Sequence, residues 1–523
     1  MGASMRRTFG WGFICLLAAI ALAAAAGGAG LAAAASPAPA ELRAPAASPG
    51  AAVSPSAVTA SPPAPAPSSG PLALLAVDGI PFRFKAEPFT IHELPIKERP
   101  GWSSHVMSKV DHGLHDAQGV RMHRIHGKLY DFPRGQSSYG LANLSSYVVT
   151  GDKFYLDRAL AQADRLMSTH RDAGGAWYFP TWPSRSRHGR TGEYIPAPYY
   201  SALTGGRILM FFSRLAEVTS SEKWRDAAGH AFLAFLRPGP RSGPYILNVD
   251  SQGYYWLEEW PWPGMRPDHT LNGHNTASYG VFEYYVVTHD ERARALFRAA
   301  VTTIKHHLSA YRRPGWISCY CLEHRSTNAN YHGMHIGQLL QLYHMTGALV
   351  FARAADAFMS DYPRPAVRGR LRVEPGAYQA VQASSGGAVT GRRTVAVRRE
   401  ATWGTSVRKR LWPGSPIYIR ANSGPVAGWW IPERAGRAYL LGTAEQHFYD
   451  PARKLTVAAG ETLTALQFDE RGRVTARLRV DSGDGLRLGV DARAVIDGDA
   501  RVRVSEGELA GYWIRLRAGV RLF

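Results

Sequence analysis

The stretch "VVTGDKFYLDRALAQADRLM", residues 148–167, joins a short turn to a helical pattern, and three later stretches repeat this arrangement. They are "EVTSSEKWRDAAGHAFLAFL", "VVTHDERARALFRAAVTTIKHHL" and "HMTGALVFARAADAFMSDY". The threonines of the four turns are spaced by 69, 69 and 58 residues, and they are Thr150, Thr219, Thr288 and Thr346. Each turn follows a run with apolar residues three and four apart and precedes a polar helix-start residue. Helix pairs at one period are typical of repeat architectures, so the sequence predicts an α/α toroid of about four helix pairs over residues 131–363.

A second kind of repeat follows, because strand-like alternation and glycine turns dominate from about residue 364. The stretch "IRANSGPVAGWWIPERAG" (419–436) aligns without gaps with "VRVSEGELAGYWIRLRAG" (502–519). The repeat predicts two tandem all-β modules, over residues 364–452 and 453–523. Trp430 and Trp513 occupy equivalent places in them, where core packing is favoured over stacking on sugar rings.

The first 70 residues carry targeting and linker features. Basic "MGASMRR" precedes the apolar run "FGWGFICLLAAIALAAAA" and the small-residue stretch "AAAASPAPA". Residues 1–35 are therefore predicted to be a signal peptide or, because the apolar run is long, a retained membrane anchor. The Ala, Pro and Ser composition of residues 36–70 predicts a disordered linker. We expect residues 71–130 to be a lead-in that packs on the toroid, and the protein to be secreted or extracytoplasmic.

The chain is strongly basic, with a formal net charge of +20 at pH 7. A basic exported protein meets anionic lipid or acidic polysaccharide more readily than nucleic acid, and the sequence contains no nucleic-acid motif. A composition rich in Arg, Ala, Gly and Pro could also give this charge without a partner. The expected partner is an anionic polysaccharide, with a cell-envelope glycan as a further candidate for the β-modules; the oligomeric state stays open.

Metal and disulfide sites are not predicted from the spacing of cysteine and histidine. If residues 1–35 are removed, Cys319 and Cys321 remain, and a disulfide across one intervening residue is strained. His332 and His335 lie three apart at an expected helix start, but no third ligand is evident in the sequence. No cofactor is expected, and a structural calcium ion is left open.

The decapeptide "YYWLEEWPWP" (254–263) places two adjacent carboxylates, Glu258 and Glu259, among aromatic and proline residues. Charged groups are usually solvated, whereas aromatic groups are usually covered. The segment is therefore either a tryptophan-rich surface loop or a walled site that holds a carboxylate. Adjacent carboxylates normally point in different directions, so they do not supply the facing pair of a glycoside hydrolase.

Several motifs in residues 131–362 resemble the D-glucuronyl C5-epimerases, which convert glucuronate to iduronate within heparosan or heparan-type chains. In chain order they are "QSSYGLANL", "APYYSALTGGRILMFFSRL", "LEEWPWP" followed by "LNG", "SCYCLEH" and "NYHGMHIGQLLQLY". Each motif is weak alone, and it is their order and spacing that carry the resemblance. The resemblance implies an isomerase that acts on uronate residues of a polysaccharide.

The chemistry of that reaction requires two proton-transferring groups. The hydrogen on C5 lies next to a carboxylate, so its removal adds negative charge to an anionic group, which the site must neutralise. One group removes the proton from one face, and another delivers a proton to the other face. The resemblance places the signature glutamate at Glu259 and the tyrosines at Tyr320 and Tyr331. It implies Glu259 and Tyr331 as the proton pair, with Tyr320 assisting.

Further positions are implied to bind or position the substrate, and they are Glu258, Trp260, Asn272, Arg325 and His335. Two of the family's residues are changed. Trp260 stands where the family has a tyrosine, so a hydroxyl is lost. Glu323 stands where the family has an arginine, so the basic group that holds the uronate carboxylate is expected at Arg325.

Two other functions remain open at this stage. A polysaccharide lyase begins with the same abstraction of the C5 proton and then expels the C4 substituent, leaving a double bond. A cell-surface glycan-binding protein with an inactive catalytic domain would also explain the β-modules and the lost tyrosine hydroxyl. Both enzyme interpretations require Glu259, Tyr320 and Tyr331 to converge, which a structure can test.

Overall fold

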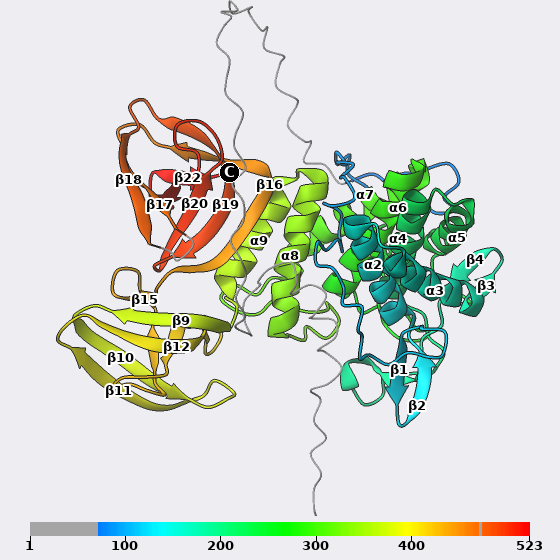
Figure 1. Cartoon of the computed structure of the whole chain (residues 1–523), viewed down its shortest axis with the longest axis horizontal. Helices are drawn as coiled ribbons and strands as arrows, with labels where there is room; N and C mark the ends of the chain where they lie inside the picture. Colours follow the sequence, from blue (N-terminus) through cyan, green and yellow to red (C-terminus); the bar gives the residue numbers. More distant parts are fainter. Residues whose placement is uncertain (1–71, 470–472) are drawn as a thin grey trace, which may run out of the picture. The chain divides into compact units, whose positions relative to one another are not determined.

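The computed structural model describes residues 72–469 and 473–523, in which a helical part is followed by two β-sheets (Figure 1). This confirms the coarse prediction of helices followed by an all-β region. The predicted signal peptide or anchor (1–35) and the linker (36–70) lie outside the described residues. Among the helices described, none combines the length and the apolar character needed to cross a membrane.

Each of the four repeated threonines is the last residue of a helix and is followed by a second helix. The helices are α2 (Pro133–Thr150), α3 (Lys153–Thr169), α4 (Ala202–Thr219), α5 (Glu222–Phe232), α6 (Leu271–Thr288), α7 (Glu291–Tyr311), α8 (Ala329–Thr346) and α9 (Leu349–Asp361). Every threonine hydroxyl donates a hydrogen bond to the carbonyl four residues earlier, at 2.6–2.7 Å. The next residue is left-handed in all four turns, namely Gly151, Ser220, His289 and Gly347. The repeated sequence pattern thus corresponds to a repeated helix–turn–helix unit.

The first helices of successive units pack against one another, α2 on α4, α4 on α6 and α6 on α8. The closest approach is between α4 and α6 and depends on two glycines. A Cβ atom on Gly206 would lie 2.5 Å from Cα of Ala277, and one on Gly280 would lie 2.0 Å from the carbonyl oxygen of Gly206. No other residue fits at these positions unless the backbones separate. Closure of these helices into a complete toroid stays a prediction.

Ion pairs cross the same helix pair inside the core. Arg214 on α4 and Glu283 on α6 are both fully buried, and the guanidinium donates to both carboxylate oxygens at 2.7 and 2.9 Å. Arg99, from the lead-in segment, also donates to Glu283 at 3.1 Å and contacts Glu217. One carboxylate therefore neutralises two buried guanidinium groups and ties the lead-in segment to the helices.

Short hairpins precede the first helix unit and lie in the connections that follow α3 and α5. The strands are β1 (Met122–Ile125) with β2 (Lys128–Asp131), β3 (Arg171–Ala173) with β4 (Ala176–Tyr178), β5 (Arg185–Ser186) with β6 (Tyr194–Ile195), and β7 (Leu247–Val249) with β8 (Tyr255–Leu257). The short 3₁₀ helices are η1 (Arg187–Gly189) and η2 (Leu233–Leu236). Strand β8 is wholly buried and leads directly into Glu258 and Glu259.

The two C-terminal sheets have the same topology. The first contains β9 (Ala366–Val373), β10 (Gly376–Ala383), β11 (Val389–Val397), β12 (Ala401–Arg410), β13 (Ile417–Ala421), β14 (Trp430–Pro432) and β15 (Ala438–Leu440). The second contains β16 (Thr443–Val457), β17 (Thr462–Phe468), β18 (Val474–Asp481), β19 (Leu486–Ile496), β20 (Asp499–Val504), β21 (Trp513–Arg515) and β22 (Val520–Leu522). Their strand orders, β11-β10-β14-β13-β12-β9-β15 and β18-β17-β21-β20-β19-β16-β22, become identical when the second set is shifted by seven. The ungapped sequence repeat therefore reflects a repeated sheet.

The structure tests the predicted role of the two repeated tryptophans and the predicted boundary between the β-modules. Trp430 and Trp513 are 7% and 8% exposed and pair with equivalent strands, so the core interpretation is confirmed. The predicted boundary at residues 452/453 is wrong, because it cuts through β16, which belongs wholly to the second sheet. Pro451 lies inside the register irregularity between Phe448 and Arg453, where the strand tolerates a proline.

Replacement of Glu283 by glutamine is expected to lower the free energy of unfolding of the helical part by about 3–5 kcal/mol. The change leaves two buried guanidinium groups without their shared negative charge. The matched control is Asp164→Asn, which removes the exposed Lys223–Asp164 pair and should cost less than about 1 kcal/mol. Denaturant unfolding followed by circular dichroism measures both, and equal losses would contradict the role of the buried network.

Candidate active site

Glu259 is a buried carboxylate that contacts a tyrosine. Glu259 is 3% exposed, and the hydroxyl of Tyr320 donates a hydrogen bond to its Oε2 at 2.7 Å. Gly273, in the first turn of α6, makes room for this carboxylate, since a Cβ atom there would lie 2.8 Å from Oε2. The walled-site interpretation of "YYWLEEWPWP" is therefore correct for Glu259.

The three predicted proton-transferring residues come together from three different segments. The backbone N–H of Leu271 donates to the carbonyl of Tyr320 at 3.0 Å, which joins the Tyr320 loop to the start of α6. Tyr331 lies in the first turn of α8, where the side chain of Asn328 caps the helix and accepts from its backbone N–H. The rings of Tyr320 and Tyr331 pack at a centroid distance of 4.5 Å. The convergence that both enzyme interpretations require is present.

Burial and charge act in opposite directions on Glu259. Burial penalises the carboxylate form and raises the pKa of Glu259, although the hydrogen bond from Tyr320 and the charges of Arg134 and Arg185 lower it. Burial and the neighbouring Glu259 also raise the pKa of the Tyr320 hydroxyl well above its ordinary value. Tyr320 therefore keeps its proton and donates a hydrogen bond to Glu259. Glu259 in turn binds a proton more tightly than an exposed glutamate does.

Trp260 provides a hydrogen-bond donor at the position where a tyrosine was expected. Its indole Nε1 donates to the hydroxyl oxygen of Tyr320 at 3.4 Å, and its ring lies 4.0 Å beneath the guanidinium of Arg185. An indole N–H can donate but cannot accept or release a proton under ordinary conditions. Trp260 can thus orient Tyr320 and position a cation, but it does not replace a proton-transferring hydroxyl.

Glu258 points away from its neighbour and contacts the loop before α6. Its carboxylate forms an ion pair with Nδ1 of His269 at 2.7 Å and accepts from the backbone N–H of the same residue at 3.2 Å. Burial lowers the pKa of His269, but the charge and hydrogen bond of Glu258, together with the charges of Asp250 and Asp268, outweigh it, so the pKa of His269 is raised. The carbonyl of Glu258 also accepts from Ala202, the first residue of α4. Glu258 therefore connects the glutamate segment to two helix starts.

The other predicted positions differ in their surroundings. Asn272 is buried in the first turn of α6, and its side-chain oxygen has no hydrogen-bond partner among the described residues. His335 is fully buried against Ser318, and burial lowers its pKa to about 3, so the ring is neutral. His332 also binds Ser318, so both histidines position the segment before Tyr320. Arg325 is exposed, so it does not lie with the buried Glu259.

Three arginines without a carboxylate partner among the described residues were not predicted, and two of them act on Glu259. The charges of Arg134, at the start of α2, and Arg185, on β5, act on Glu259, and Arg134 also repels Arg207 on α4. Arg134, Arg185 and Arg207 form no ion pair with a carboxylate anywhere in the described part of the chain, and Nε of Arg185 and Arg207 is buried without a hydrogen-bond partner. Burial lowers the pKa of Arg207 to about 10, so it is still charged at neutral pH. Arg134 precedes "QSSYGLANL" and Arg207 lies within "APYYSALTGGRILMFFSRL", which was the available signal.

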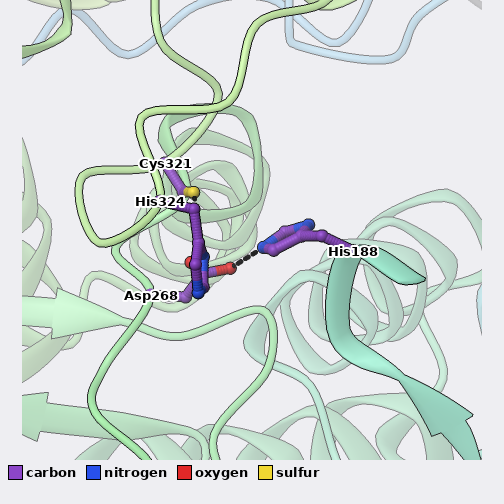
Figure 2. Close-up of side chains that lie close together, drawn as sticks. All are labelled: His188, Asp268, Cys321 and His324. Carbon is purple, nitrogen blue, oxygen red and sulfur yellow. Dashed lines mark hydrogen bonds and ion pairs between the residues drawn. The ribbon is translucent and has the colours of Figure 1, made fainter. Parts of the chain in front are cut away.

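A group of potential metal ligands lies beside Tyr320. The ring of His188 packs edge-on against Tyr320 at 5.2 Å and contacts a cluster that also contains Asp268, Cys321 and His324 (Figure 2). The expectation of no metal ligands considered only cysteine and histidine spacing along the chain. The cluster was missed because its members come from three separate connections.

Comparison with known proteins identifies the family that the helical part resembles. Residues 179–360 match the family model described as the D-glucuronyl C5-epimerase C-terminus. This match covers about a third of the chain and confirms the resemblance expected from the motifs.

One curated relative and two solved structures illustrate how distant other similarities are. The uncharacterized protein MJ1128 of Methanocaldococcus jannaschii is 28% identical over 138 residues, which cover 26% of this chain and 44% of that protein. The chain therefore spans less than half the length of the curated relative. Cellobiose 2-epimerase from Spirochaeta thermophila is 18% identical, with a TM-score of 0.35 and coverage of 47% of this chain and 63% of that one. An unsaturated glucuronyl hydrolase from Streptococcus agalactiae is 16% identical, with a TM-score of 0.31 and coverage of 44% and 58%.

The family match supports a carbohydrate epimerase at a coarse level, located in the helical part. It includes Glu259, Tyr320, Tyr331 and Arg207, but Arg134 lies before it. The individual residue roles and the substrate are not determined by the match.

Proposed function

We propose that the helical part epimerises C5 of uronate residues in an anionic polysaccharide, such as the glucuronate of heparosan. The observation that carries the proposal is the buried Glu259, hydrogen-bonded to Tyr320 at 2.7 Å beside Tyr331 and acted on by the charges of Arg134 and Arg185, which have no carboxylate partner in the described part of the chain. A carboxylate base, a tyrosine acid and a cluster of positive charge are the groups that C5 proton transfer requires.

In the proposed reaction, the carboxylate of Glu259 takes the C5 proton, and the electron pair of the C–H bond moves into the uronate carboxylate. Tyr331 then donates its hydroxyl proton to C5 from the opposite face, which inverts the carbon. Protonated Glu259 and deprotonated Tyr331 return to their starting states by proton exchange with solvent. Tyr320, which is already engaged with Glu259, holds the base in position during the transfer.

Positive charge is assigned to the uronate carboxylate in this proposal. The intermediate carries two negative charges on that group, so nearby guanidinium groups stabilise it more than they stabilise the substrate. Arg207 is the preferred partner, because it is half-buried, charged and without an ion pair among the described residues. The overall charge of +20 favours an anionic polymer, and we propose that the reaction takes place outside the membrane.

Incubation with heparosan and other uronans in heavy water tests the reaction directly. Deuterium should enter C5 without the absorbance of a new double bond. Glu259→Gln should reduce exchange by roughly 10²- to 10⁴-fold, because the base is removed. The matched control, Glu323→Gln, changes an exposed glutamate in the neighbouring motif and should retain exchange. Unsaturated ends would indicate a lyase instead, and no exchange with any uronan would refute proton transfer at C5.

The pH dependence of kcat/KM should show the raised pKa of Glu259. The reaction requires the carboxylate form, so the rate should fall as the pH drops through a pKa above the ordinary glutamate value. Tyr320→Phe removes a hydrogen bond that lowers this pKa, so the acidic limb should move to higher pH. Tyr194→Phe, at an exposed tyrosine, is the control and should leave the limb in place. A limb that moves to lower pH in Tyr320→Phe would contradict the assigned contact.

Arg207→Gln should raise KM about tenfold or more, because a charge-assisted contact to the substrate carboxylate is lost. Steady-state kinetics on the same polymer measure this, and Arg225→Gln is the matched control at a surface position of α5. An unchanged KM together with an unchanged kcat would remove Arg207 from substrate binding.

A further inference from the structure

Four side chains from three connections place nitrogen, oxygen and sulfur atoms around one point. His188 comes from the α3–α4 connection, Asp268 from the β8–α6 connection, and Cys321 and His324 from the α7–α8 connection. Their ligand atoms all lie within 4.8 Å of one another. Figure 2 shows the imidazole of His188 pointing at Asp268, with Cys321 and His324 close to Asp268.

Two of the distances within the cluster are shorter than those of a tetrahedral site, and one matches it. Nε2 of His188 lies 2.5 Å from Oδ2 of Asp268, Nδ1 of His324 lies 3.0 Å from Oδ1, and Sγ of Cys321 lies 3.6 Å from Nδ1 of His324. Tetrahedral zinc, with bonds of about 2.0–2.3 Å, separates its ligand atoms by about 3.3–3.6 Å. Small side-chain shifts would therefore admit a metal ion.

Neighbouring residues fix the orientation of the cluster through hydrogen bonds, as is usual for metal ligands. Nε2 of His324, on the side away from Asp268, faces Oε1 of Glu193 at 2.8 Å. Glu193 in turn accepts from Nε of Arg187 at 2.6 Å. A carboxylate that accepts from the outer nitrogen of a ligating histidine sets the tautomer that presents Nδ1 to the metal.

The cluster also has an explanation without metal, as a buried hydrogen-bond network. Oδ2 and Oδ1 of Asp268 lie 2.5 and 3.0 Å from ring nitrogens of His188 and His324, so one carboxylate joins both histidines. Cys321 is the weakest member of such a network, because a thiol is a weak donor and a weak acceptor. Its sulfur lies 3.6 Å from Nδ1 of His324 and 3.7 Å from Oγ of Ser326, and it also forms a hydrogen bond with Asp268.

We propose that His188, Asp268, Cys321 and His324 bind a structural zinc ion that joins the three connections around Tyr320. A donor set of one sulfur, two nitrogens and one oxygen suits zinc, whereas calcium and magnesium prefer oxygen donors alone. All four positions are filled by protein, so the ion has no open position for substrate. Cys321 follows Tyr320 directly and His188 packs on its ring, so the ion positions that tyrosine. The proposal does not depend on the reaction proposed above.

Metal analysis of the purified full-length chain tests the proposal first. After treatment with a chelator and titration with zinc, about one zinc ion per chain should remain bound and the melting temperature should rise. Cobalt(II) in place of zinc should give the absorption band of a thiolate ligand. The other possible group, Glu98, His344 and Asp450, contains no sulfur and two exposed residues, so cobalt bound there gives no such band.

Two cysteine variants locate the sulfur ligand. Cys321→Ser should abolish the thiolate band and lower the zinc affinity at least tenfold. Cys319→Ser changes a buried cysteine two residues away, outside the cluster, and should retain both the band and the affinity. If Cys321→Ser fails to fold, His188→Gln keeps the sulfur and should lower the affinity while the band persists. Absence of zinc binding, or a band unchanged in Cys321→Ser, would mean that the cluster is a hydrogen-bond network alone.

Discussion

The close approach of α4 and α6 is the constraint on which the site depends. It exists because Gly206 and Gly280 have no side chains, so that two backbones meet where any Cβ atom would overlap. Both helices begin next to the glutamate segment. Glu258 accepts the first backbone N–H of α4, and Gly273 in the first turn of α6 leaves space for Glu259. A larger separation of the helices would therefore displace both carboxylates.

The interior of this helix pair concentrates charge in two ways. Near the middle, Glu283 neutralises Arg214 and Arg99 and contributes to stability. Near the start of α4, Arg207 has no such partner and is accompanied by Arg134. Burial of unpaired like charges is unfavourable in the free protein and becomes favourable when an anion binds. For this physical reason, the paired arginines Arg214 and Arg99 are assigned to folding, whereas Arg207 and Arg134 are assigned to substrate binding.

Local sequence signals predicted the repeated units well. The four threonines end four helices because each hydroxyl binds its own helix while the next residue turns left-handed, and both requirements involve neighbouring residues. The β repeat was predictable for a similar reason, since equivalent strands keep equivalent turns and buried tryptophans. The correct boundary was not predictable, because the predicted one lies within a single long strand, β16, whose pairing with β19 and β22 is set by residues far along the chain.

The site was predictable only where a motif joined its residues. Glu259, Tyr320 and Tyr331 were grouped through the family resemblance, and the structure brings them into contact. Asp268 and His188 occupy unremarkable sequence positions, and tertiary packing alone makes them neighbours. Arg207 lies within one of the motifs but was not singled out there.

The position of Tyr320 shows why connections, rather than helices, determine this site. Its hydroxyl contacts Glu259 and Trp260 from one connection, its ring packs on His188 from another, and its carbonyl accepts from the start of α6. Each of these connections contains a left-handed non-glycine residue, His188, His269 or Arg325. Such backbone conformations persist only where surrounding contacts over-determine them. The side chains that link the connections therefore have to hold these backbone conformations in place. The Glu258–His269 ion pair and the cluster of Asp268, Cys321 and His324 lie where they can do so.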